Sequence, residues 1–543
     1  MDRYVTDIKN GCYQNPVLPM DFSDPDAIRV GEDYYLISSS FTYLPGVPVL
    51  HSKDLVHWER IGNCVERLPF DRYAQPAHGC GTWAPALRYH AGRFYAFIPL
   101  PDEGIFYTEA TDPAGPWSAL HCVKSASGWI DPCPLWDDDG SVYMAHAFAK
   151  SRCGIKHKIQ LSRLDPETLE VVEDGPIVFD GTLSQPTAEG PKMYKRNGWY
   201  YVFAPAGGVK TGWQTVLRSK NPFGPYEYKV VMRQGDSPVN GPHQGAWVDT
   251  VTGQDWFLHF QDVYAGGRIV HLQPMHWEND WPIIGINKPG NDYGEPVMEY
   301  TKPDIGKSNS YPVCEPDTSD DFTSDKLGMQ WQWNANPQKD WYELTGSKLK
   351  LNALDTVPLR PVSDYRNLLL QKWPAPEFTC VTKMQLSGME NGDVAGVVSL
   401  GTEYGALAVE KRDNKYTVRQ ILGTQYFDCD MPYTTQNSND FELSESDFKD
   451  TGKTVTFRYT VKCTGHIDHM ELNLPVKAAP VEELTLELSF DGKNYEKAFS
   501  FASKAGRWVG VKNGIFCAHD NTVKNDKTGY VLVDSVEYMP KED

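Results

Sequence analysis

The chain has 543 residues and a formal net charge of −20, with 40% hydrophobic and 12% aromatic residues. This length exceeds one ordinary globular core, so two domains are expected. The acidic balance leaves no basic surface to neutralise phosphates, which argues against nucleic acid and anionic membranes as partners and is compatible with a neutral substrate.

The first residues and the cysteines bear on location. MDRYVTDIKNGCYQ lacks the apolar core of a signal peptide. We therefore expect a cytoplasmic protein, or a secreted or periplasmic one whose signal has been removed. No run of 18 apolar residues occurs, so no transmembrane span is expected. The eleven cysteines are scattered without a CxxC pair, which predicts buried free thiols rather than zinc ligands or disulfides.

A pattern of paired short strands repeats five times in residues 1–292, with starts at positions 24, 83, 131, 189 and 243. Each copy has a polar or aromatic residue in a Pro/Gly turn, a short strand, a turn of Gly, Asp or Asn, and an aromatic-rich strand. This order is typical of β-hairpins. Hairpin repeats of about 50 residues predict the blades of a five-bladed β-propeller.

The residue that leads each repeat should face the central channel, because the first strand of a propeller blade lines the axis. These residues are Asp24, Trp83, Asp131, Glu189 and His243. Three carboxylates and a histidine brought together cost desolvation and mutual repulsion. Such a cluster is more typical of an active site than of a structural core.

Three neighbouring carboxyl groups suit the hydrolysis of a glycosidic bond. One protonates the leaving oxygen, and a second activates water or attacks the sugar. A third can raise the pKa of the acid by like-charge repulsion. Asp24, Asp131 and Glu189 meet this requirement. Asp26, two residues after Asp24, is an alternative, but a turn or supporting carboxylate is the more ordinary interpretation.

Seven motifs resemble those of glycoside hydrolase family 43. In chain order they are SDPDAIRVGEDYYL, LHSKDLVHW, TWAPALRYHAGRFY, WIDPCPLWDDDG, AEGPKMYKRNGWYY, PHQGAW and GGRIVHLQPMHW. That family consists of inverting five-bladed propellers and includes β-xylosidases, α-L-arabinofuranosidases and arabinanases. The resemblance implies that Asp24 is the general base, Glu189 the general acid, and Asp131 the residue that tunes and orients the acid.

The same resemblance implies which residues contact the sugar. Phe41 and Trp83 would stack on a pentose ring, and the Arg268 guanidinium would bind the glycone. Trp213, in a Gly-rich loop, is a candidate for the aglycone side. Tyr43 fits the pocket and the core equally well.

Calcium is the expected cofactor by the same resemblance. The residue matching His243 lies beneath the family's active site, near a bound Ca²⁺. Calcium prefers oxygen ligands, so His243 would order water around the ion. Asp321 and Asp534 are candidates for a second, structural calcium. His466 and His469 have zinc-like spacing but no partner ligands nearby, and are expected on the surface.

The pattern changes beyond residue 292. Residues 293–318 are rich in Pro, Gly, Asp and Ser and are predicted to be a linker. Residues 319–543 alternate short strands with turns, which predicts a β-sandwich and an all-β protein. DDFTSDKLGMQWQWNANPQKDWYEL resembles the concanavalin-like jelly roll attached to many family 43 β-xylosidases. There it packs on the propeller and can lend a residue to the pocket rim. WQWNANP is expected at that interface rather than as a sugar-stacking surface.

Together these features predict an exo-acting, inverting glycoside hydrolase that removes terminal β-D-xylose or α-L-arabinofuranose from xylo- or arabino-oligosaccharides of hemicellulose. Relatives include multimers, so a homo-oligomer is a further expectation. The alternatives are an endo-arabinanase and a non-catalytic carbohydrate-binding protein on the same scaffold. All three axial carboxylates are present, which disfavours the second. A retaining fructan-active enzyme is disfavoured because WIDPCP has Ile where its Arg-Asp-Pro motif needs Arg.

Overall fold

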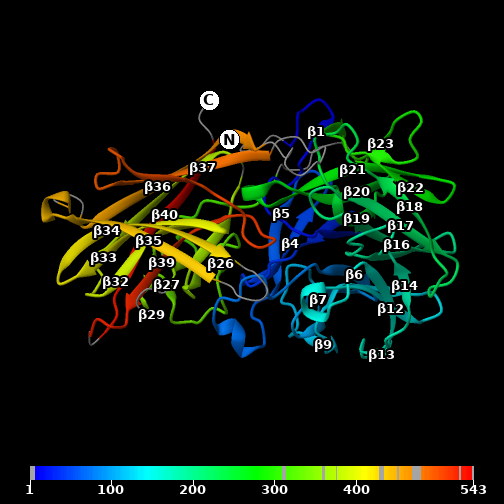
Figure 1. Ribbon diagram of the computed structural model, residues 1–543, viewed down its shortest axis with the longest axis horizontal. Coiled ribbons are helices and arrows are strands. Elements are labelled where there is room, and N and C mark those ends of the chain that lie inside the picture. Colours follow the sequence, from blue (N-terminus) through cyan, green and yellow to red (C-terminus); the bar gives the residue numbers. More distant parts are fainter. Residues whose placement is uncertain are drawn as a thin grey trace.

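The computed structural model describes residues 6–307, 314–356, 361–374, 376–426, 433–448, 452–467, 479–524 and 527–540. Two β-rich lobes lie side by side, the N-terminal lobe on the right and the C-terminal lobe on the left of Figure 1. Helix is limited, in these residues, to α1 (Lys150–Cys153) and to the 3-10 turns η1 (Asp71–Ala74), η2 (Tyr264–Gly266), η3 (Val362–Asp364) and η4 (Glu445–Phe448). No helix in this part of the chain has the length and apolar character needed to cross a membrane. The all-β prediction is confirmed.

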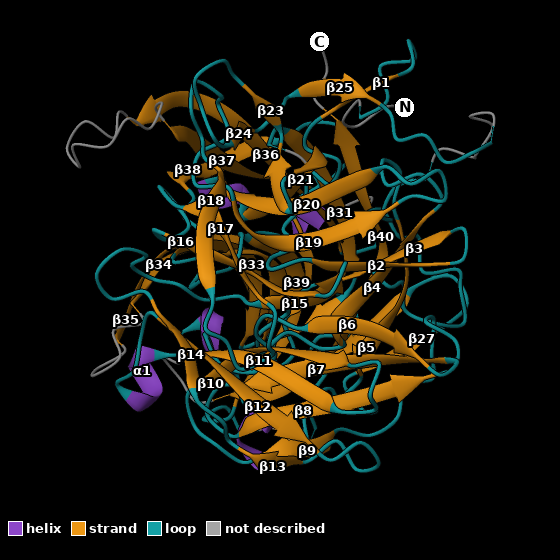
Figure 2. Cartoon of the chain, turned by 90° about the vertical axis from the view of Figure 1, so that its right-hand side faces the viewer, coloured by secondary structure: helices purple, strands orange, loops and turns teal. Residues whose placement is uncertain are grey.

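Five sheets, one for each sequence repeat, form the blades of the N-terminal propeller (Figure 2). Blade 1 contains β2 (Asp26–Val30), β3 (Asp33–Ile37), β4 (Gly46–Ser52) and β5 (Glu59–Val65). Blade 2 contains β6 (Ala86–His90), β7 (Arg93–Leu100), β8 (Gly104–Ala110) and β9 (His121–Lys124). Blade 3 contains β10 (Trp129–Trp136), β11 (Val142–Phe148), β12 (Lys158–Leu164), β13 (Val171–Glu173) and β14 (Ile177–Asp180).

The last two blades complete the ring. Blade 4 contains β15 (Lys192–Arg196), β16 (Trp199–Ala206), β17 (Trp213–Ser219) and β18 (Glu227–Met232), extended by β24 (Gly294–Glu295) and β23 (Ile286–Asn287). Blade 5 contains β19 (His243–Asp249), β20 (Asp255–Asp262), β21 (Arg268–Glu278) and β22 (Trp281–Ile284). Arg29 of blade 1 donates to Asp249 of blade 5 over 2.7 Å, which ties the last blade to the first.

Short strands beyond residue 292 pair with the propeller. Besides β24, the strand β25 (Glu299–Thr301) pairs with β1 (Cys12–Gln14). The first part of the segment 293–318, predicted to be a linker, therefore folds with the propeller. The Pro- and Gly-rich composition concealed these strands because each is only two or three residues long.

The C-terminal lobe is a sandwich of two sheets around a continuous apolar core. One sheet has the order β26 (Gln332–Trp333), β30 (Leu369–Lys372), β39 (Lys512–Asp520), β32 (Asp393–Leu400), β33 (Glu403–Arg412), β34 (Lys415–Tyr426) and β35 (Tyr433–Leu443), with β29 (Leu354–Thr356) beside β39. The other has the order β27 (Tyr342–Leu344), β28 (Leu349–Asn352), β40 (Tyr530–Pro540), β31 (Phe378–Gln385), β36 (Thr454–Ile467), β37 (Ala479–Ser489) and β38 (Glu496–Ala502). His466 lies in β36, and His469 lies outside the described residues.

The two lobes are joined by backbone pairing. Leu44 and Trp333 exchange both backbone hydrogen bonds, at 3.0 and 2.6 Å. Trp331 and Trp333 are each 2% exposed. The WQWNANP segment therefore lies against the propeller, as its interpretation as an interface predicts, and these two rings are not free to stack on a glycan.

Candidate active site

A pocket of about 130 Å³ opens at one end of the propeller, where the blades meet the sandwich. It is lined by Asp24, Phe41, Trp83, Ala84, Ile130, Asp131, Glu189, Val209, Gln244, Arg268 and Trp508. The structure thus brings together the three predicted catalytic carboxylates and three of the four predicted sugar-contacting residues. One lining residue, Trp508, comes from the sandwich.

Unusual backbone geometry places the two aspartates. Asp24 and Asp131 both have φ of 56°, in the left-handed region that residues other than glycine seldom adopt. Asp24 precedes β2, and Asp131 lies where the pairing of β10 with β11 shifts register. Strained positions of this kind are concentrated at functional sites.

The carboxylate of Asp24 is held in one orientation by three donors. Its Oδ2 atom accepts hydrogen bonds from the Ser23 and Ser39 hydroxyls, each 2.8 Å long. Its Oδ1 atom accepts one from Nη1 of Arg268 over 3.0 Å. Arg268 also donates to the Ser23 hydroxyl over 2.8 Å. These contacts fix the orientation of the Asp24 carboxylate and place the Arg268 guanidinium at the pocket wall.

Asp131 and Glu189 form a pair with unequal environments. Burial, the charge of Glu189 and the charge of Asp24 raise the pKa of Asp131 to about 8, although the Gly190 N–H donates to its Oδ2 over 2.8 Å. Burial also raises the pKa of Glu189. Two contacts lower this pKa by more: the hydrogen bond with His243, whose Nε2 lies 3.1 Å from Glu189 Oε1, and the charge of Arg268. The pKa of Glu189 therefore lies below its ordinary value. The two shifts have opposite directions, so Asp131 holds a proton more readily than Glu189.

Asp131 makes stability depend on pH. Its folded pKa of about 8 lies above the unfolded value of 3.8, so the folded state binds the extra proton between these values and stability falls as pH rises through this window. Asp131→Asn removes the charge but keeps an acceptor for the Gly190 N–H. We expect this variant to melt several degrees above the wild type at pH 8, with the difference shrinking toward pH 4, as measured by calorimetry. An equal or lower Tm at pH 8 would contradict the assignment.

Three aromatic rings form one wall of the pocket. The Phe41 ring lies 6.2 Å from Trp508 at an interplanar angle of 26°, and Trp83 meets Trp508 edge-on at 4.7 Å. Trp508 has φ of 63°, which turns it out of the sandwich loop. Aromatic faces of this kind stack on the apolar face of a sugar ring.

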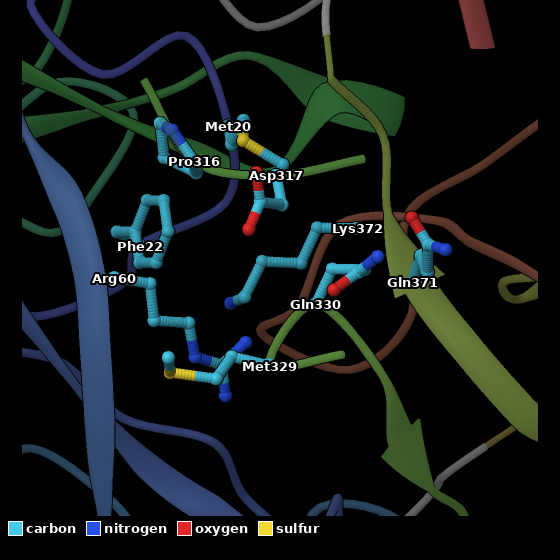
Figure 3. Close-up of a pocket in the computed structure, with 9 residues that line it drawn as sticks. All are labelled: Met20, Phe22, Arg60, Pro316, Asp317, Met329, Gln330, Gln371 and Lys372. Atoms are coloured by element: carbon cyan, nitrogen blue, oxygen red, sulfur yellow. The ribbon is translucent and has the colours of Figure 1, made fainter. Parts of the chain in front are cut away.

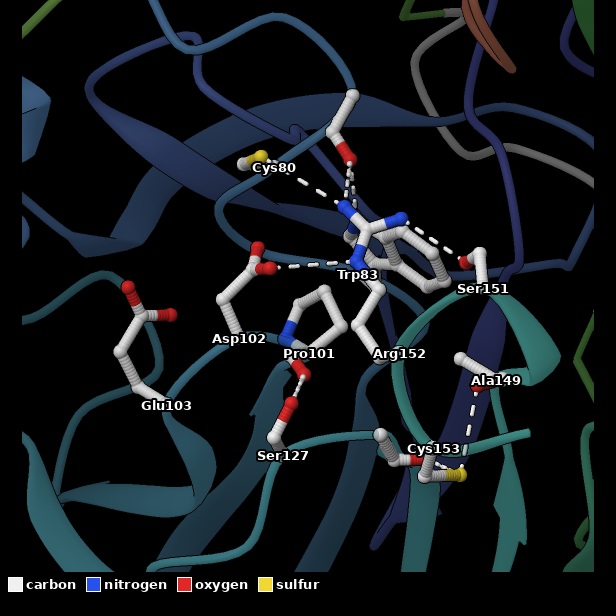
Figure 4. A network of polar contacts seen from close by, with 12 residues as sticks. Cys80, Trp83, Pro101, Asp102, Glu103, Ser127, Ala149, Ser151, Arg152 and Cys153 are labelled. Carbon is white, nitrogen blue, oxygen red and sulfur yellow. Dashed lines mark hydrogen bonds and ion pairs between the residues drawn. The ribbon is translucent and has the colours of Figure 1, made fainter. Parts of the chain in front are cut away.

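Arg152, at the end of α1, supports the Trp83 ring from outside the pocket (Figure 4). Its guanidinium carbon lies 5.1 Å from the centre of that ring. Asp102 accepts from Arg152 Nε over 3.2 Å and fixes the guanidinium. The Trp83 Nε1–H donates to the Gly79 carbonyl over 3.2 Å. A cation–π contact and a hydrogen bond therefore restrict the ring.

Two aromatic residues singled out from the sequence lie elsewhere. Trp213, predicted on the aglycone side, is not among the lining residues. Its Nε1–H donates to Gln185 over 2.7 Å, and the Arg233 guanidinium covers its ring at 4.8 Å. Tyr43 is buried in the interface with the sandwich, beneath the Lys512 ammonium at 4.7 Å. Neither residue lines the pocket that contains the carboxylates.

Asp26 has a structural environment. Its Oδ2 atom accepts from the Leu87 N–H and from Nη1 of Arg88, both at 2.8 Å, and Lys192 Nζ lies 3.7 Å away. This carboxylate joins blades 1, 2 and 4 at the axis and does not line the pocket. The ambiguity between Asp24 and Asp26 is resolved in favour of Asp24 as the pocket residue.

Each of the three residues predicted to lie near calcium contacts other side chains of the protein. His243 is fully buried, its Nε2 contacts the carboxylate of Glu189, and its Nδ1 has no hydrogen-bond partner among the described residues. Asp534 already accepts from Lys348 and Lys383, and Asp321 is exposed and accepts from Thr323. The described part of the chain contains no group of three His, Cys, Asp or Glu side chains placed to hold a metal. Ca²⁺ takes six to eight oxygen ligands, and water can supply them. An ion held by water near His243 therefore stays a prediction.

Five lining residues were not predicted from the sequence: Ala84, Ile130, Val209, Gln244 and Trp508. The first four adjoin or follow the repeat motifs, so their position next to the axis could have identified them. Trp508 carries only the weak signal of flanking glycines in GRWVG, because its place in the pocket depends on how the domains pack.

Comparisons with known proteins agree with this geometry. Residues 13–282 match the sequence model described as Glycosyl hydrolases family 43. Residues 319–539 match the model described as Beta xylosidase C-terminal Concanavalin A-like domain.

Individual relatives cover most of the chain. A putative β-xylosidase of Xylanibacter ruminicola is 43% identical over 384 residues, which span 70% of this chain and 69% of that protein. A non-reducing-end α-L-arabinofuranosidase of Bacteroides ovatus is 31% identical over 445 residues, spanning 77% and 79%. A solved structure described as Bacteroides ovatus Xyloglucan PUL GH43B superposes with a TM-score of 0.77 at 25% identity, covering 98% of this chain and all of that one.

Proposed function

This chain belongs to glycosyl hydrolase family 43 and is a glycoside hydrolase, and we propose that it removes single terminal pentose residues from hemicellulose oligosaccharides with inversion of configuration. The observation that carries the proposal is the pocket itself. Asp24 and Glu189 line it together with a guanidinium and an aromatic wall. These are the groups that a neutral sugar and its hydrolysis require.

Asp24 is the proposed general base. Its orientation is fixed by Ser23, Ser39 and Arg268, so that it can take a proton from a water on the face of the sugar opposite the leaving group. Water attacks the anomeric carbon as the glycosidic bond breaks. Because attack and departure occur in one step on opposite faces, the product has the inverted anomeric configuration.

Glu189 is the proposed general acid, and it needs a proton, although its pKa is lowered while that of Asp131 is raised. The Glu189 side chain is 31% exposed. A sugar in the pocket excludes solvent water from the exposed part of Glu189. The resulting desolvation favours the neutral form of its carboxyl group. We infer that the shared proton moves from Asp131 toward Glu189 when substrate binds, and then passes to the leaving oxygen. Once Asp131 has given up the proton, its negative charge favours the protonated form of Glu189 by like-charge repulsion.

The shape of the pocket supports release of single sugars from chain ends. Its volume of about 130 Å³ is small, and Trp508 of the sandwich stands at its wall where an open groove would have to continue. The relatives' names include both β-xylosidase and non-reducing-end α-L-arabinofuranosidase. Terminal β-D-xylose and α-L-arabinofuranose are therefore the proposed glycones.

The test is hydrolysis of p-nitrophenyl β-D-xylopyranoside and p-nitrophenyl α-L-arabinofuranoside, each with and without a calcium chelator. We expect release of nitrophenol from at least one of them, and the ratio of the two kcat/KM values identifies the preferred sugar. A folded protein that cleaves neither glycoside, but shortens linear arabinan internally, would contradict exo action. Loss of rate with the chelator, restored by Ca²⁺, would support the predicted ion.

A further inference from the structure

A third aspartate of the same segment, Asp21, connects the propeller to the sandwich beside the pocket. It is 3% exposed. Its Oδ1 atom accepts the backbone N–H of Arg268 over 2.9 Å, and its Oδ2 atom accepts the backbone N–H of Gly510 over 2.9 Å. Arg268 belongs to the propeller and Gly510 to the sandwich, so one carboxylate bridges the two lobes.

Glycines bring the two loops close enough for this bridge. Gly267 has φ of 80°, and a Cβ atom there would lie 2.6 Å from Asp21 Oδ1 and from the Gly510 Cα. A Cβ on Gly510 would lie 2.8 Å from the Gly266 carbonyl oxygen. The Val511 N–H then donates to the Ala265 carbonyl over 2.8 Å. The backbones touch directly, without side chains between them.

Each bridged loop carries a residue of the pocket wall. Arg268 donates to Asp24 over 3.0 Å. Trp508, two residues before Gly510, packs on Phe41 and Trp83. The spacing between the guanidinium and the Trp508 ring therefore depends on the two hydrogen bonds of Asp21.

Buried cations surround this carboxylate. The Lys372 ammonium donates to the Asp21 carbonyl and lies 4.8 Å from the centre of the Phe22 ring. Figure 3 shows Lys372 extending between Phe22 and Arg60 in the interface. Burial lowers the pKa of Lys372 well below its ordinary value and that of Lys512 to about 8, and the negative charge of Asp21 opposes both shifts. The Asp21 carboxylate therefore offsets the buried positive charge of the lysines in addition to joining the Arg268 and Gly510 backbones.

We propose that Asp21 is a positioning residue, which fixes the sugar-binding arginine and the Trp508 loop relative to each other across the domain interface. This rests on the proposed function, because it assigns Arg268 and Trp508 to the same sugar. Asp21 itself does not line the pocket. Its effect on the reaction passes through these two residues, and substrate affinity should respond more than the chemical step.

The test compares Asp21→Asn with Asn336→Asp. The side chain of an asparagine at 21 can accept one of these two backbone N–H groups with its oxygen. Its NH2 group, which cannot accept, faces the other N–H, so one bridging hydrogen bond is lost. Asn336 makes another contact between the lobes, donating to the Leu68 carbonyl and accepting from the Leu68 N–H at 2.8 and 2.9 Å. Asn336→Asp also loses one such hydrogen bond, but outside the pocket. Both are isosteric, so their Tm values show whether they weaken the interface to a similar extent.

We expect Asp21→Asn to raise KM for the better aryl glycoside by at least about ten-fold with kcat changed less than about three-fold, and Asn336→Asp to leave KM within about two-fold. An unchanged KM in Asp21→Asn, or an equal rise in both variants, would overturn the proposal. If Asp21→Asn does not fold, Asp21→Ser, which keeps one acceptor, replaces it.

Hydrogen exchange separates this proposal from the proposed function. Amides of the segment 506–512 should exchange at least about ten-fold faster in Asp21→Asn than in the wild type and Asn336→Asp. A wild type that cleaves neither glycoside would refute the proposed substrate, while unchanged exchange in Asp21→Asn would refute the bridge.

Discussion

Glu189→Gln is expected to lower kcat on xylo- or arabino-oligosaccharides by about 10²–10⁴-fold, because glutamine cannot protonate the leaving oxygen. The loss should depend on the leaving group. A dinitrophenyl glycoside, whose phenolate leaves without a proton, should retain a rate within about ten-fold of the wild type. The measurement is kcat on a series of aryl glycosides of decreasing leaving-group pKa, beside an oligosaccharide.

A buried glutamate of the sandwich provides the matched control. Glu482 is 3% exposed in β37, far in sequence from the pocket, and burial raises its pKa to about 7. Glu482→Gln should leave the rates on all these substrates unchanged. Equal losses on activated and unactivated substrates in Glu189→Gln would show that Glu189 does not act as the acid.

Asp24→Asn is expected to reduce kcat by about 10²–10⁴-fold on every substrate, whatever the leaving group, because asparagine cannot accept the proton of the attacking water. The side chain keeps an oxygen for Arg268, so the wall of the pocket should stay in place. The independence from the leaving group distinguishes a lost base from a lost acid.

The neighbouring carboxylate supplies the control for Asp24. Asp26→Asn removes the negative charge that pairs with Arg88 and weakens the contacts between blades. We therefore expect a lower Tm, with kcat within about three-fold of the wild type. Loss of activity in folded Asp26→Asn together with retained activity in Asp24→Asn would reverse the assignment of the base.

Much of the catalytic lobe could be predicted from the sequence, because a repeat of hairpins carries its own geometry. Equivalent positions in five repeats converge on one axis, and this placed Asp24, Asp131 and Glu189 together before any contact was known. Within the repeat, counting forward to the aromatic pair Tyr34-Tyr35 favours Asp24 over Asp26, but the sequence does not show what Asp26 contacts. In the structure Asp26 accepts hydrogen bonds from Leu87 and Arg88 and lies outside the pocket lining, whereas Asp24 lines the pocket.

The parts that sequence could not predict depend on packing between distant segments. Trp508 reaches the pocket and Asp21 reaches Gly510 only because the sandwich lies against the propeller. The Gly-rich surroundings of Trp213 indicate a loop but not its direction, and in the structure the Arg233 guanidinium covers its ring outside the pocket lining. Lys348 and Lys383, far away in sequence, form ion pairs with Asp534, and a calcium ion there stays a prediction.

The configuration of the first product tests the central claim, a single displacement with Asp24 as base and Glu189 as acid, most directly. The substrate is the better of the two aryl glycosides, followed by proton NMR from the first minutes of the reaction, before the released sugar equilibrates. For the β-xyloside the account predicts that α-xylose appears first, and for the α-arabinofuranoside that β-arabinose appears first. Initial release of the sugar with retained configuration would require a covalent intermediate and would contradict the mechanism.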